Sequence, residues 1–175
     1  MKDHILYTKK IPVLFLIIFF LIYPFYSCDE EPELKSPHKI GSKDRVNIVS
    51  GEEAIMMIDE MHGLSVAPNA NIIVEYGANK KDMLYISYYR DGEDAQKDFQ
   101  QMIDKMETAK NSPFSHLMRL PEYESDVYFT LGMGAIHYIY CSSNYILWFQ
   151  TEQTFGRNLP AELLNIYPIN TSNST

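Results

Sequence analysis

The chain has 175 residues, of which 15 are Lys or Arg and 23 are Asp or Glu, so its formal net charge at pH 7 is −8. Without residues 1–27, which hold three Lys and one Asp, the balance is 12 basic to 22 acidic residues. A domain with this excess of negative charge repels phosphate backbones, so we expect no nucleic-acid partner. The length suits one domain with its own hydrophobic core.

The N-terminus has the pattern of an export signal. Lys2, Lys9 and Lys10 precede sixteen uncharged residues, 11–26, with the sequence IPVLFLIIFFLIYPFY. As a helix this run would be about 24 Å long, shorter than the roughly 30 Å hydrocarbon core of a bilayer. The length favours a secretory signal over a permanent span, and the lysines predict that everything after the run lies outside the cytoplasm.

A small residue, Ser27, and a cysteine, Cys28, end the apolar run, and an acidic stretch follows. This arrangement resembles the signal peptide of bacterial lipoproteins, in which the cysteine becomes the lipidated first residue of the mature chain. The resemblance implies a signal peptide over residues 1–27, lipidation of Cys28 and a place in the bacterial cell envelope, with the membrane as a partner through the lipid anchor. The alternative anchor is an uncleaved N-terminal transmembrane helix.

The composition divides the rest of the chain into three parts. Residues 28–45 are rich in Glu, Lys, Ser and Pro and poor in large apolar side chains, which predicts a flexible acidic tether. A single domain is expected over residues 46–168, followed by a polar tail at 169–175. If Cys28 is lipidated, the only other cysteine, Cys141, has no partner, so the fold must depend on its core and not on an internal disulfide.

The first half of the domain reads as a helix, a hairpin and a second helix. The helical spacing of Ala54, Ile55, Ile58 and Met61 predicts the first helix. Strands are expected at 71–77 and 83–90, with a turn between them. The second helix is expected within residues 91–111, where one apolar face recurs at helical spacing. That face consists of Ala95, Phe99, Met102, Ile103 and Met106.

The second half reads as a loop, three strands and a short helix. Residues 112–125 have two prolines and no clean period, which favours a loop with at most a short strand around Leu117. Three strands at 126–132, 135–143 and 145–152, separated by tight turns, indicate an antiparallel meander. A last helix is expected over 159–167. Together these elements predict an α+β fold, with a single antiparallel sheet of about five strands and two to three helices packed on one face.

The strands carry aromatic residues on both faces, and this raises the main question about a binding site. From the alternation around His137, we take Tyr138, Tyr140 and Trp148 as a candidate outward-facing surface. Tyrosine and tryptophan combine apolar area with a polar tip, so such a surface suits an envelope protein, a glycan or a flat ligand. The alternative is that these aromatics simply favour pleated sheets.

No residue pattern predicts catalysis, a metal or a cofactor. His137 has no second histidine at metal-binding spacing. His137 and Cys141 are four residues apart on one strand, about 13 Å, which is too far for a base and its nucleophile. We therefore expect a binding or assembly module. The alternative is a small hydrolase-like envelope enzyme whose catalytic groups meet only in the fold.

Overall fold

A computed structural model describes residues 32–62 and 68–169 of the chain. Cys28 and the predicted signal peptide lie outside these residues, so their assignment stays a prediction. The compact unit that contains the described residues begins at Glu31.

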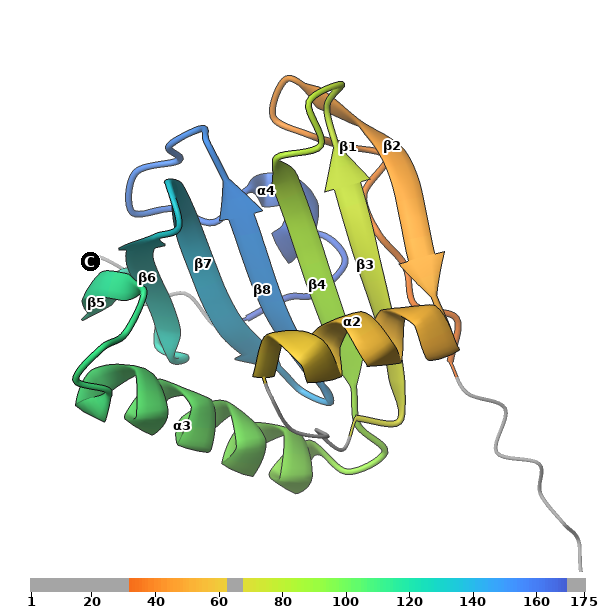
Figure 1. The fold of residues 1–175 in the computed structure, drawn as a ribbon. Coiled ribbons are helices and arrows are strands. Elements are labelled where there is room, and N and C mark those ends of the chain that lie inside the picture. The colour runs from red at the N-terminus through yellow and green to blue at the C-terminus, as the bar shows by residue number, and fades with distance from the viewer. Residues whose placement is uncertain (1–31, 63–67, 170–175) are drawn as a thin grey trace, which may run out of the picture. The chain divides into compact units, whose positions relative to one another are not determined.

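The described chain folds around one curled antiparallel sheet of eight strands (Figure 1). The order across the sheet is β1-β2-β3-β4-β8-β7-β6-β5, so each half of the chain builds one half of the sheet, and β4 meets β8 at the centre. The strands are β1 (Lys39–Ile40), β2 (Lys43–Ser50), β3 (Ala70–Tyr76), β4 (Asp82–Tyr88), β5 (Phe114–Arg119), β6 (Val127–Gly132), β7 (Ala135–Ser142) and β8 (Tyr145–Thr151).

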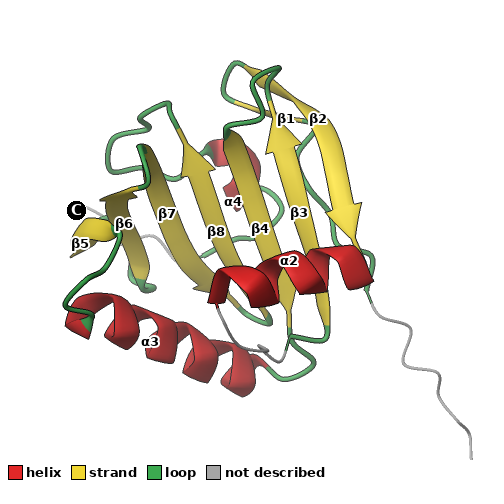
Figure 2. Cartoon of the chain, in the orientation of Figure 1, coloured by secondary structure: helices red, strands yellow, loops and turns green. Residues whose placement is uncertain are grey.

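Helices lie on both faces of the sheet (Figures 1 and 2). On one face, here called the helix face, α2 (Glu52–His62) packs against β2 and β3, and α3 (Gly92–Thr108) packs against β5, β7 and β8. The opposite face holds the main core, which is closed by the short helix α4 (Ala161–Leu164) and by both ends of the described chain.

The predicted sheet of about five strands, with all helices on one face, is therefore wrong. The five predicted strands correspond to β3, β4, β6, β7 and β8. The other three strands lie at the edges: β1 and β2 were missed, and β5 was expected only as a possible short strand around Leu117. Edge strands bury little surface, so they lack the regular alternation that identifies a strand in a sequence. β2 and β5 are each mostly exposed and interrupted by a register shift, and β1 has only two residues.

The domain also begins earlier than the predicted boundary between residues 45 and 46. Ile40 is 2 % exposed and Leu34 packs against the main core. Arg45 donates to the backbone carbonyl and the hydroxyl of Ser36, at 3.1 and 2.8 Å. Residues 34–45 are thus built into the fold, and they do not serve as a flexible tether.

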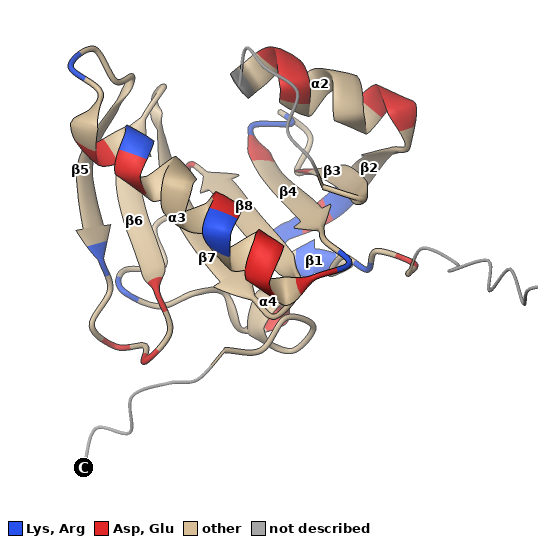
Figure 3. Cartoon of the chain, turned by 90° about the horizontal axis from the view of Figure 1, so that it is seen from below, with Lys and Arg blue, Asp and Glu red and all other residues tan. Residues whose placement is uncertain are grey.

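Helix α3 confirms the helical face read from the sequence. Asp91 caps its N-terminus by accepting a hydrogen bond from the backbone N–H of Glu93 at 2.8 Å, as aspartate does at many helix starts. Ala95, Phe99 and Ile103 are fully buried against the sheet. Most of the charged residues of α3 are exposed, and Figure 3 marks their positions along the helix.

Candidate binding surface

Two of the three predicted surface residues lie in the interior of the domain. Tyr138 and Tyr140 are both 0 % exposed, on the face of β7 that forms the main core. They are opposite Phe149 and Leu147 of β8, respectively. The interpretation of these tyrosines as part of an outward-facing surface is therefore wrong.

Trp148 lies on the other face of the sheet. The β7–β8 turn consists of Ser143 and Asn144 alone, so Ser142 is opposite Tyr145 and Ile139 is opposite Trp148. Opposite residues of an antiparallel pair share a face, which places Trp148 with Ile139 on the helix face. The three residues do not form one surface.

Most core tyrosines use their hydroxyl groups to fasten covering segments to the sheet. Tyr138 donates to the carbonyl of Gly156 and accepts from the N–H of Phe155, both at 3.1 Å. Tyr76 and Tyr167 hold the N-terminal segment by donating to the carbonyls of Pro37 and Lys35, at 2.9 and 2.7 Å. These tyrosines thus have a structural role, because they bind residues 35–37 and the segment after β8 over the core.

Tyr140 differs from the other tyrosines of this core. Its hydroxyl group is buried and has no hydrogen-bond partner within the described part of the chain. Burial raises the pKa of Tyr140, with smaller contributions from Tyr167 and Tyr123 nearby. An unpaired buried hydroxyl group weakens a fold, so Tyr140 is a point where a stability test is informative.

On the helix face, Trp148 is hydrogen-bonded to a buried histidine. The indole N–H of Trp148 donates to Nδ1 of His137 at 2.9 Å, and Nε2 of His137 lies 2.9 Å from the carbonyl of Gly132. This arrangement requires the neutral tautomer with its proton on Nε2. Burial lowers the pKa of His137, and the bond to Gly132 opposes this only in part. With both ring nitrogens engaged, His137 is a packing residue of this face.

The helix face has two separate small cores, with a seam between them at Tyr85 and Trp148. Tyr85 packs in the cluster under α2, and Trp148 packs in the cluster under α3. These two side chains are directly opposite each other on β4 and β8, and each is half-buried. Trp148 therefore remains within reach of solvent, although the two tyrosines predicted with it do not.

Helix α2 exposes three large apolar side chains, here called the methionine face. Met56, Met57 and Met61 are 65 %, 37 % and 56 % exposed, respectively. The helix is held to the sheet by Ala54 and Ile58, which are buried. Met61 was expected on the buried side with them, and its exposure is a correction to the sequence reading. Three neighbouring exposed methionines are unusual on a solvent-facing helix and suit an adaptable apolar contact.

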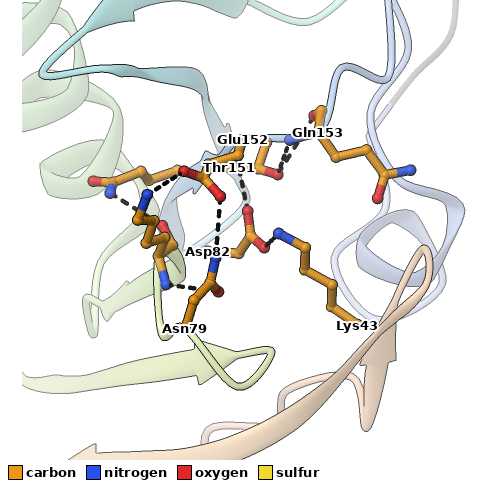
Figure 4. A network of polar contacts seen from close by, with 8 residues as sticks. Lys43, Asn79, Asp82, Thr151, Glu152 and Gln153 are labelled. Carbon is orange, nitrogen blue, oxygen red and sulfur yellow. Dashed lines mark hydrogen bonds and ion pairs between the residues drawn. The ribbon is translucent and has the colours of Figure 1, made fainter.

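The charged groups at the upper end of the sheet form a paired network (Figure 4). Asp82, which is 1 % exposed, forms an ion pair with Lys43 and accepts the backbone N–H of Glu152 at 2.8 Å. Lys81 bonds the carboxylate of Glu152 at 2.7 Å and thereby lowers its pKa. Asp82 and Glu152 each have their own cation. The contacts of Asp82 with Lys43 and with the backbone of Glu152 join β2, β4 and the end of β8.

Three other kinds of site were considered: a reactive cysteine, a metal site and a membrane-spanning helix. Burial raises the pKa of the Cys141 thiol to about 11, so the thiol is a weak nucleophile at neutral pH. Within residues 32–62 and 68–169, no group of three or more His, Cys, Asp or Glu side chains could hold a metal ion. In the same part of the chain, no helix has the length and apolar character needed to cross a bilayer.

Comparisons of the chain with protein-family models, with curated proteins and with solved structures found no match. The methionine face and the seam were not singled out in the sequence. Met61 was expected on the buried side of its helix. Ala54 and Ile58 are four residues apart and mark the buried side of the helix. Met56, Met57 and Met61 lie off that side, and this was the sequence signal for an exposed apolar surface.

Proposed function

We propose that this protein is an exported, lipid-anchored binding or assembly module of the bacterial cell envelope. The N-terminal pattern that ends in Cys28 supports the anchor, and the methionine face supports binding. A lipid on Cys28 would anchor the domain that follows to the membrane. A partner would then be a protein of the same membrane or of its surface.

The observation that carries the binding role is the exposure of Met56, Met57 and Met61 on one short helix. Methionine side chains are flexible and polarisable, so they adapt to apolar segments of different shapes. We therefore propose an envelope protein that presents an apolar segment to α2. The net negative charge of the domain makes an anionic lipid surface a poor ligand for the same region.

The anchor is tested with the variant Cys28→Ser. If the cysteine is lipidated, this variant accumulates as an unprocessed precursor and incorporates no labelled fatty acid. Equal labelling of the parent chain and the variant would refute the lipoprotein assignment. An uncleaved N-terminus in the parent chain would favour the membrane helix.

The binding surface is tested by photo-crosslinking in intact envelopes. A photoreactive amino acid is placed at Met61, and the matched control places it at Gln100, an exposed position on α3. We expect one discrete adduct from position 61, none from position 100, and loss of the adduct when Met57 is replaced by Ser. A similar set of adducts from both positions would mean that the methionine face has no partner.

A further inference from the structure

The two edges of the sheet are built differently. At the β5 edge, the register breaks between Ser115 and Met118, and His116 has a left-handed φ of 59°. Irregular backbone of this kind hinders pairing with another strand. At the β2 edge, the register shift lies at the start of the strand, between Arg45 and Asn47, and residues 47–50 pair with β3 without a further break. Among the described residues, β1 is the only strand beyond β2. Its residues pair with Lys43 and Asp44, and the N–H of Arg45 donates to the carbonyl of His38 just before β1 at 2.8 Å.

The open part of β2 lacks the usual protection of an edge strand. No charged residue and no proline occurs between Arg45 and Glu52. Two β-branched side chains on this stretch, Val46 and Ile48, are 48 % and 44 % exposed. Exposed edges with β-branched residues and no charge are surfaces on which another strand can pair.

We propose that the outer edge of β2 pairs with the same edge of a second copy of this chain, antiparallel and centred on Ile48. A two-fold axis perpendicular to the sheet places Ile48 opposite Ile48 of the second copy and keeps the corresponding faces on the same side. This interaction goes beyond the proposed function, and it requires neither the lipid anchor nor the methionine face.

Charge favours a second copy as the occupant. Apart from Lys43, which pairs with Asp82, the end of the open edge nearest β1 carries Lys39, Asp44 and Arg45, a net charge of +1, and Glu52 and Glu53 follow its other end. An antiparallel second copy brings the acidic end of each chain toward the basic end of the other. Helix α2 does not obstruct this approach, because it runs from the end of β2 across the sheet toward β4 (Figure 1).

The contact is small, so the dimer should be weak. A strand pair of about five residues buries much less than the roughly 1,200 Å² typical of stable complexes. A covalent trap is therefore the appropriate measurement. Opposite Cα atoms in an antiparallel pair are about 4.5–5.5 Å apart, which lies within the range that a disulfide can bridge.

The test uses the full chain with Ile48→Cys under mild oxidation, analysed on a non-reducing gel. The matched control is Val46→Cys, at a similarly exposed position on the same strand. In the proposed register the two Val46 positions are offset by four residues, about 13 Å along the strand, so they cannot form a disulfide. The parent chain controls for Cys28 and Cys141. We expect at least about fivefold more dimer from Ile48→Cys than from Val46→Cys, given this difference in distance.

A second variant tests the edge while keeping the reporter cysteine. Adding Asn47→Lys to the Ile48→Cys chain places like charges on the two paired edges and should remove most of the dimer. Adding Gln96→Lys, on the exposed side of α3, should leave the yield unchanged. Equal dimer yields from the Ile48 and Val46 variants would overturn the proposal. So would crosslinking of Ile48→Cys only to a different protein, which would identify the edge as a site for another chain.

Discussion

The hydroxyl groups of Tyr138 and Tyr140 should affect stability with opposite signs. Both side chains are 0 % exposed on the same face of β7, so the Phe variants remove one oxygen each from equally buried sites. Tyr138 loses two hydrogen bonds, to Phe155 and Gly156, each worth about 0.5–1.5 kcal/mol. Tyr138→Phe should therefore lower the free energy of unfolding by about 1–3 kcal/mol.

Tyr140→Phe should stabilise the protein instead. The variant removes a buried hydroxyl group that has no partner among the described residues, and an unpaired buried group of this kind costs about 1–3 kcal/mol. We expect a gain of about 1 kcal/mol, which is roughly 2–4 °C in melting temperature for a chain of this size. The measurement is chemical denaturation of the parent chain and both variants, with a thermal melt as a second probe.

The result for Tyr140 can refute this reasoning. A loss of more than about 1 kcal/mol in Tyr140→Phe would mean that the hydroxyl group has a partner, such as a buried water molecule. A loss of similar size in both variants would mean that the hydrogen-bond assignment does not distinguish the two sites.

Three further predictions concern the core and its closure. Burial lowers the pKa of His137, so just below pH 6.5 the unfolded chain binds more protons than the folded chain. The contribution of neutral His137 to the free energy of unfolding is therefore complete above pH 6.5, and it declines as the pH falls toward the folded-state pKa. Urea midpoints between pH 5 and 8 should show this decline, and His137→Gln should remove it. Phe99→Ala should cost about 3–5 kcal/mol, since Phe99 is 0 % exposed; a loss below about 1 kcal/mol in denaturation would contradict the packing of α3. A chain that begins at Val46 should be much less stable than one that begins at Glu31, because it lacks Ile40 and the carbonyls that Tyr76 and Tyr167 bind. Equal melting temperatures of the two chains would show that residues 31–45 are dispensable.

The sequence was sufficient to predict the elements that are locally encoded. Helix α3 has a capping aspartate and a continuous apolar face, and the structure confirms both the helix and the burial of Phe99 and Ile103. The β3–β4 hairpin and the β6–β7–β8 meander were also predicted, since their turns carry Gly, Asn and Ser. The lipid anchor at Cys28 and the envelope location were inferred from the same kind of local pattern, and they stay predictions.

The candidate surface shows where local patterns were insufficient. Alternation divides the side chains of β7 into two sets, one on each face, and it does the same for β8. It does not show which set of β7 lies on the same face as which set of β8. The two-residue turn at Ser143 and Asn144 does contain that information, because it makes Ser142 opposite Tyr145 and so separates Tyr138 from Trp148. Applying this register would have excluded the predicted surface from the sequence alone.

Which face is buried, and by what, was decided only by the tertiary structure. Both faces of the strands are apolar, so the sequence is compatible with covering either one. The two ends of the described chain determine the outcome. Residues 34–40 and α4 close the main core, whereas α2 and α3 cover the other face as two separate clusters. Polar, proline-containing residues such as those at 34–40 read locally as a tether. They become part of the fold because their backbone carbonyls accept hydrogen bonds from Tyr76, Tyr167 and Arg45. No local sequence pattern specifies these partners.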